Sequence, residues 1–80
     1  MILTKETRDY VRDGTLLRSK YESYMVTGIW DQGKGKCITV AIMEVSDPKH
    51  KCWVGHRVYG RPMSEYYGLE IINYGIEEGR

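Results

Sequence analysis

Glycine- and proline-containing turns divide most of this chain into short segments rich in β-branched and aromatic residues. Turn signals lie at residues 31–35, where two glycines fall within three positions, at 46–49 and at 60–62. The intervening segments predict four strands, over residues 22–30, 36–45, 51–59 and 66–74. Because such short connections join antiparallel neighbours, we expect an antiparallel meander.

The strand register follows from keeping the large apolar residues on one side of this sheet. Pairing Trp30 with Lys36 in the first hairpin sets Val26 opposite Val40. The other pairs predicted are Gly28 with Ile38 and Tyr24 with Ile42 in the first hairpin, and Ile38 with Val58, Val40 with His56, Ile42 with Val54 and Glu44 with Cys52 in the second. The expected apolar face consists of Tyr24, Val26, Ile38, Val40, Ile42, Val54 and Val58.

The N-terminal residues carry signals of a different element. Thr4 suits a helix N-cap, Glu6 falls in the first turn, and Gly14 stands where a left-handed C-cap residue belongs. We therefore expect a short helix over residues 4–13, stabilised only by packing because its apolar face is narrow. Residues 15–20 are expected to be helical or irregular.

These elements predict an α+β fold for one domain over residues 1–80, with the short N-terminal helix packed on an antiparallel meander of about four strands. An all-β small barrel is the alternative, and residues 5–21 decide between the two. A chain of 80 residues buries roughly 60–65% of the surface that it exposes when unfolded, so the core is thin.

Charge and hydropathy exclude several classes of protein. The formal net charge of +1 argues against a strongly basic protein dedicated to polyanions. No apolar run approaches the ~18 residues of a membrane span, and charge from Lys5 onward interrupts any secretory signal. We expect a cytoplasmic protein, and in a reducing compartment free thiols at Cys37 and Cys52.

The sequence gives little support for a metal site or for catalysis. Cys37, His50, Cys52 and His56 are potential zinc ligands, but none forms the closely spaced pair that structural zinc sites use. On an extended strand, His50 and His56 would lie roughly 20 Å apart. No nucleophile–base arrangement or hydrolase motif is evident. We therefore expect no metal, no cofactor and no enzymatic activity.

Residues 33–36 at the predicted hairpin tip have features of a phosphate-binding loop. Gly33 and Gly35 expose backbone N–H groups, and Lys34 and Lys36 add positive charge. The segment is not a Walker A loop, because that spacing and the following Ser or Thr are missing. A hairpin tip with solubilising lysines is the simpler interpretation, and an anion-contacting loop stays open.

Aromatic and basic residues alternate with core residues along the predicted third strand. Lys51, Trp53, Arg57 and Tyr59 point away from the apolar face in the expected register, and Tyr66 extends this aromatic surface. Such residues can complete a small core, form a protein-binding hot spot or stack on single-stranded nucleic acid.

From these features we predict a small non-enzymatic binding protein, an inhibitor or adaptor of the kind found among small regulators and phage-encoded inhibitors. The predicted contact residues are Trp53, Arg57, Tyr59, Lys51 and Tyr66, with Lys34 and Lys36 as a basic rim. The expected partner is another protein, and homodimers are possible. The alternative is a single-stranded nucleic-acid or nucleotide-binding module that uses the same surface.

Overall fold

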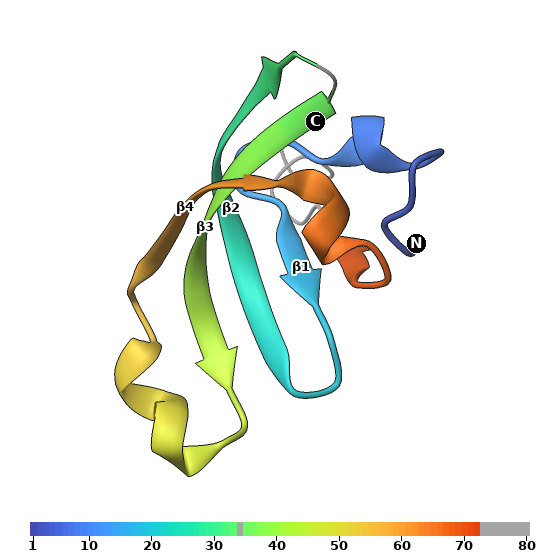
Figure 1. Ribbon diagram of the computed structural model, residues 1–80. Coiled ribbons are helices and arrows are strands. Elements are labelled where there is room, and N and C mark those ends of the chain that lie inside the picture. The colour runs from blue at the N-terminus through green and yellow to red at the C-terminus, as the bar shows by residue number, and fades with distance from the viewer. Residues whose placement is uncertain (34, 73–80) are drawn as a thin grey trace.

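The computed structural model describes residues 1–33 and 35–72, which form one antiparallel sheet with short 3₁₀ turns (Figure 1). The strands are β1 (Leu16–Arg18), β2 (Glu22–Gln32), β3 (Gly35–Val45), β4 (Arg57–Pro62) and β5 (Glu70–Ile72). Their order across the sheet is β4-β3-β2-β1-β5, so that β2 lies at the centre between β3 and β1.

Helical structure in the described residues is confined to three 3₁₀ turns, η1 (Arg8–Tyr10), η2 (Pro48–Trp53) and η3 (Met63–Tyr66). The prediction of an α+β domain with an N-terminal helix is therefore wrong. The sheet is not a closed barrel either, because within the described residues β4 and β5 form its two edges and do not pair with each other. No helix in this part of the chain is long and apolar enough to cross a membrane.

The N-terminal segment folds as turns because a side chain competes with helical hydrogen bonding. The Thr7 hydroxyl donates to the Ile2 carbonyl at 2.7 Å and accepts from the Thr4 N–H at 2.8 Å. The Leu3 N–H donates to the carbonyl of Leu69 at 2.7 Å, which holds the segment against the residues before β5. Long-range contacts thus override the capping pattern that favoured a helix.

The β2–β3 hairpin confirms part of the predicted register and corrects the rest. Val26 pairs with Val40 as expected. Between Val26 and Gly28 a β-bulge inserts an extra residue, Thr27, so that Trp30 pairs with Cys37 rather than with Lys36. Tyr24 pairs with Ile42 as expected, whereas Gly28 pairs with Thr39 and not with Ile38.

The pairing of β3 with β4 departs further from the predicted register. Residues 48–53 form η2, which extends the predicted turn through residues 51–53 of the predicted strand. Asp47 caps η2 by accepting from the Lys49 N–H at 2.9 Å, and Pro48 is its first residue. Strand β4 consequently starts at Arg57, later than predicted. Val40 pairs with Val58, and Ile38 pairs with Arg61. The predicted core position Val54 is exposed, as is His56.

Strand β1 occupies residues that were expected to be helical or irregular. Leu17 pairs with Tyr24 of β2 on one side and with Ile71 of β5 on the other. This arrangement buries the Leu17 side chain completely. Strand β5 lies within the predicted fourth strand, whose first residue, Tyr66, belongs to η3 instead; Asn73 and Tyr74 lie outside the described residues.

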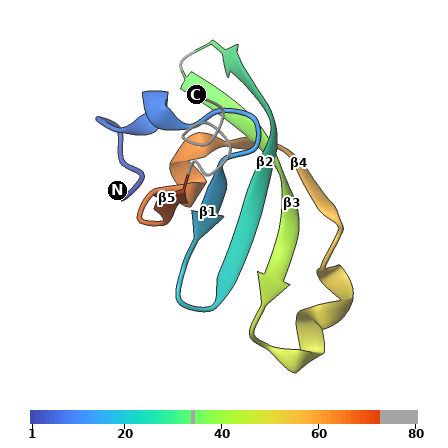
Figure 2. The same ribbon diagram turned by 180° about the vertical axis from the view of Figure 1, so that it is seen from behind.

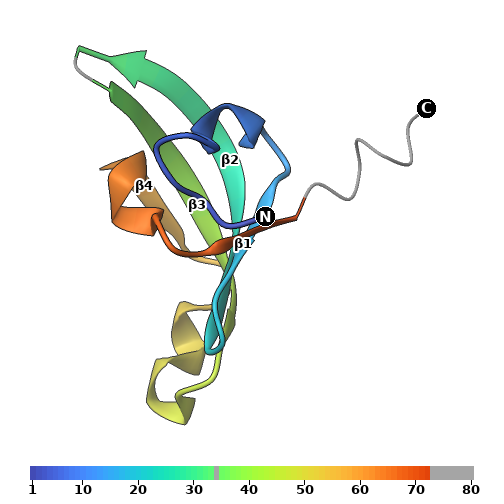
Figure 3. The ribbon, with the colours of Figure 1, turned by 90° about the vertical axis from the view of Figure 1, so that its right-hand side faces the viewer.

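The core forms on one face of the sheet, which we call the inner face. The N-terminal segment and η3 both lie over it (Figure 3). Leu3, Val11, Met63 and Tyr66 from these segments pack against strand residues of the inner face. The strand residues of the core are Leu17, Val26, Ile38, Val40 and Ile71. We call the opposite face of the sheet the outer face.

Candidate functional site

A row of apolar side chains crosses the outer face from β5 to β3. Ile72, Leu16, Met25 and Ala41 are cross-strand neighbours in register, and Arg57 of β4 ends the row. All four apolar residues are half-buried. Viewed from behind, the connection between η1 and β1 crosses β3 near the β2–β3 turn, whereas the lower parts of β2 and β3 have no other described element in front of them (Figure 2). The half-buried side chains of the row are thus partly accessible among the described residues.

Trp30 extends this apolar surface toward the β2–β3 turn. A Cβ added to Gly60 would lie 3.7 Å from the indole, and one added to Gly28 would lie 3.8 Å from it. The indole therefore lies over these two glycines, and a Cβ at either position would be in ordinary van der Waals contact with it. Gly60 also has a positive φ of 60° at the bulge in β4. Trp30 is nevertheless 41% exposed.

Tyr59 and Arg57 complete the surface on the edge strand β4. Tyr59 is 70% exposed, the largest fraction among the exposed apolar and aromatic side chains of the described residues. Arg57 is exposed as well, and among the described residues no hydrogen bond or ion pair holds its guanidinium. We call Leu16, Met25, Trp30, Ala41, Arg57, Tyr59 and Ile72 the outer-face patch.

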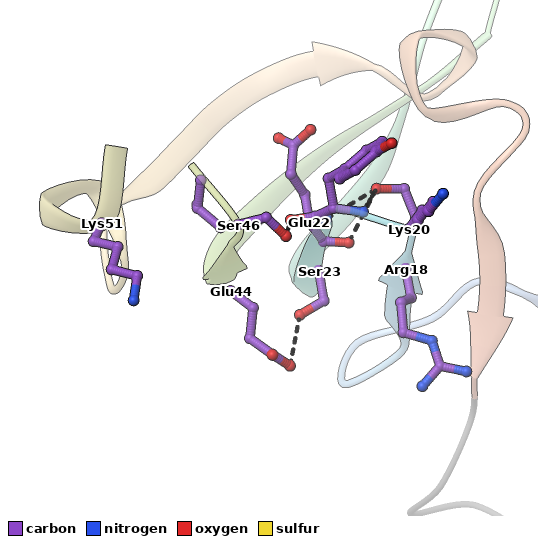
Figure 4. Close-up of a pocket in the computed structure, with 10 residues that line it drawn as sticks. Arg18, Lys20, Glu22, Ser23, Glu44, Ser46 and Lys51 are labelled. Carbon is purple, nitrogen blue, oxygen red and sulfur yellow. Dashed lines mark hydrogen bonds between the residues drawn. The ribbon is translucent and has the colours of Figure 1, made fainter. Parts of the chain in front are cut away.

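A polar row borders the outer-face patch at the end of the sheet nearer η2. Arg18 forms an ion pair with Glu70 at 2.9 Å, and the Ser23 hydroxyl donates to Glu44 at 3.3 Å. The side chains of Arg18, Ser23 and Glu44 extend to the same side of the sheet, whereas Glu22 extends to the other (Figure 4). An apolar centre with a polar rim is the usual anatomy of a protein–protein interface.

The predicted contact residues divide between two places. Arg57 and Tyr59 belong to the outer-face patch, but Trp53 does not share a strand with them. It ends η2, is 49% exposed and stacks on His50 with ring centroids 4.2 Å apart. Lys51 is also in η2 and lines a pocket of about 360 Å³ with Glu44 and other residues of that end. The structure thus separates Trp53 and Lys51 from Arg57 and Tyr59.

The remaining predicted residues have other roles or places. Tyr66 is only 9% exposed and packs edge-on against Tyr24 with centroids 5.8 Å apart, so it belongs to the core and does not extend the exposed aromatic surface as expected. Lys36 is half-buried and forms an ion pair with Asp31 at 3.1 Å. Lys34 lies outside the described residues.

Burial raises the pKa of both core tyrosines. For Tyr24, the hydrogen bond that its hydroxyl donates to Glu22, and the negative charge of that carboxylate, raise the pKa further. For Tyr66, the charge of Glu65 raises the pKa and that of Arg61 lowers it in part. The raised pKa values keep both hydroxyls protonated at the alkaline pH at which an exposed tyrosine ionises.

The described residues contain no group of three or more Cys, His, Asp or Glu side chains placed to hold a metal ion. Cys37 and Cys52 are free thiols. No family model matches the chain, and no curated protein or solved structure matches it either. The outer-face patch therefore has to be interpreted from its own chemistry.

Trp30 is the surface residue that sequence reasoning missed. Its face depends on the bulge at Thr27, because one extra residue reverses which side of the sheet the following residues occupy. Two glycines at positions 28 and 60 were the available signal, since a glycine within a strand often marks a bulge or the close approach of another group.

Proposed function

We propose that this protein is a non-enzymatic binding protein that contacts a partner protein through the outer-face patch, as an inhibitor or adaptor in the cytoplasm. The observation that supports it is the grouping of the exposed Trp30, Tyr59 and Arg57 beside a row of half-buried apolar residues on the outer face. Trp, Tyr and Arg are the residue types that dominate binding hot spots.

The chemistry of the patch defines the partner. Its row of aliphatic side chains suits an apolar surface, and Arg57, which has no ion pair among the described residues, suits a carboxylate at the rim of that surface. Nucleic acid fits less well, because tight phosphate binding needs several cations. Arg57 is the one cation of the outer-face patch, and the neighbouring Arg18 is already paired with Glu70.

Binding with matched tryptophan variants tests the proposal. The tagged protein is used to capture partners from a lysate of its own host, with wild type, Trp30→Ala, Tyr59→Ala and Trp53→Ala compared. We expect a partner retained by wild type and Trp53→Ala and weakened about 30-fold or more by Trp30→Ala or Tyr59→Ala. Trp53 is the control, since it is exposed to a similar extent as Trp30 but lies in η2. Circular dichroism confirms that each variant is folded.

Two outcomes would replace this proposal. Equal loss of the partner in Trp53→Ala and Trp30→Ala would remove the outer-face patch as the binding surface. Retention of an oligonucleotide that falls steeply with rising salt would favour the single-stranded nucleic-acid alternative, because phosphate binding releases counterions. Sedimentation of the purified protein shows whether the partner is a second copy of this chain, and Tyr59→Ala would then abolish dimerisation.

A further inference from the structure

A pocket of about 480 Å³ lies near the β2–β3 turn, at the opposite end of the sheet from η2. Its polar and charged lining comes from three separate parts of the chain. Arg8 belongs to η1, Gln32 and Lys36 to the β2–β3 hairpin, and Ser64 and Tyr67 to η3 and the residue after it. None of the outer-face residues Trp30, Arg57 and Tyr59 lines it.

The charges of this pocket are positive. Arg8 is half-buried, and among the described residues no ion pair or hydrogen bond holds its guanidinium. Lys36 is paired with Asp31 at 3.1 Å, but the Asp31 side chain is 82% exposed and does not line the pocket. Solvent screens so exposed a carboxylate strongly. No Asp or Glu is among the described residues that line the pocket.

Hydrogen-bond donors are in excess at the same place. The hydroxyls of Ser64 and Tyr67 can each donate, and the amide oxygen of Gln32 is already engaged by the Cys37 thiol at 3.1 Å. The ammonium of Lys36 keeps donors that Asp31 does not use. A wall of donors and cations without a competing carboxylate is complementary to an anion.

The volume of the pocket and the rest of its lining indicate a ligand larger than a bare anion. A volume of about 480 Å³ falls in the range of small-molecule sites. Pro62 and the Tyr67 ring are exposed and supply apolar surface for the body of a ligand. We propose that this pocket binds a small organic phosphate monoester, whose dianion is held by Arg8 and Lys36 and whose body packs on Pro62 and the Tyr67 ring.

Titration of the full chain with adenosine 5′-monophosphate, ribose 5-phosphate and phenyl phosphate tests this site. We expect at least one ester to bind with a Kd of about 1 mM or tighter. Arg8→Gln should weaken that binding about tenfold or more, because a charged hydrogen bond is lost. Arg12→Gln is the matched control, since Arg12 is exposed in the same segment and does not line the pocket.

The two cysteines give a second, independent measurement. Cys37 lines the pocket, whereas Cys52 lies in η2 at the other end of the sheet. The bound ester should slow alkylation of Cys37 by iodoacetamide and leave the rate at Cys52 unchanged.

Three outcomes would overturn the proposal: no binding of any of the three esters at about 1 mM, equal weakening by Arg8→Gln and Arg12→Gln, or equal protection of both thiols. Titrations with inorganic phosphate and with adenosine complete the experiment. If either one bound as tightly as the best ester, the phosphate and the organic body would not be recognised together, and the proposal would be overturned. Because Trp30 and Tyr59 do not line the pocket, failure here leaves the outer-face proposal standing, and the reverse also holds.

Discussion

Replacing two adjacent leucines of β1 measures which face of the sheet is the core. Leu17 is completely buried between Tyr24 and Ile71, whereas its neighbour Leu16 is half-buried on the outer face beside Met25. Alternation along a strand places these two side chains on opposite faces. The Leu17→Ala and Leu16→Ala variants therefore remove the same atoms from two different environments.

The burial of each leucine sets the expected loss of stability. Truncating a fully buried leucine removes its transfer free energy and leaves a cavity, so Leu17→Ala should lower the free energy of unfolding by about 3 kcal/mol. Leu16→Ala creates no closed cavity, and its cost should be about 1 kcal/mol or less. A domain of 80 residues has a total stability of about 4–12 kcal/mol, so the first loss is a large share of it.

Urea unfolding followed by far-ultraviolet circular dichroism distinguishes the two. With a slope of about 1 kcal/mol per molar urea, Leu17→Ala should lower the midpoint by about 3 M and Leu16→Ala by about 1 M or less. If Leu17→Ala does not fold, Leu17→Val, which should cost about 1 kcal/mol, keeps the comparison possible. Equal losses, or a larger loss for Leu16→Ala, would refute the assignment of the inner and outer faces.

Three further predictions concern turns and titration. Gly60→Ala should cost about 1–2 kcal/mol because its φ is +60°, whereas Gly35→Ala, which has open space and no positive φ, should cost less in the same urea assay. Asp47→Ala should lower stability by about 0.5–1 kcal/mol through loss of the η2 cap, and similar stability of the two proteins would contradict that role. Because the pKa values of Tyr24 and Tyr66 are raised on folding, their contribution is complete below about pH 10 and is lost at higher pH. Tyr66→Phe should therefore make stability fall less steeply above pH 10 in pH-dependent urea unfolding, and an unchanged slope would contradict the assignment.

The central hairpin could be predicted where the alternation of residues is regular. Val26 and Val40 pair as expected because a slip by one residue would move the apolar set to the other face. Beyond Thr27 the same reasoning fails, since a bulge adds a residue without changing the composition of the strand. The position of Trp30 on the outer face follows from that extra residue, so simple alternation could not reveal it.

Two other predictions, the strand from residue 51 and the N-terminal helix, were wrong because local sequence signals compete with other interactions. Asp47 and Pro48 correctly indicated a turn, but the turn continues as η2 through Trp53, a residue type that favours strands. At the N-terminus, the capping pattern favoured a helix, yet hydrogen bonds from Leu3 to a segment more than sixty residues away stabilise another structure. Contacts of that sequence separation are not visible in local propensity.

The edges of the sheet limit how a partner can bind. At β5, Ile2 forms a bridge with Glu70, and the Ile71 N–H donates to the Met1 carbonyl at 2.7 Å, so the N-terminus covers part of that edge. At β4, the bulge at Gly60 and the terminal Pro62 interrupt the ladder. Bulges, prolines and covering segments are the features that prevent strand addition.

A partner that cannot extend the sheet through backbone hydrogen bonds must be recognised by side chains. Within the outer-face patch, Tyr59 and Trp30 are the exposed aromatic side chains. Binding through an edge would survive their truncation, because backbone groups would carry it, whereas binding through the face would not. The Tyr59→Ala variant therefore separates these two modes of association as well as testing the patch, and a dimer that persisted in it would form through an edge or through a surface outside the patch.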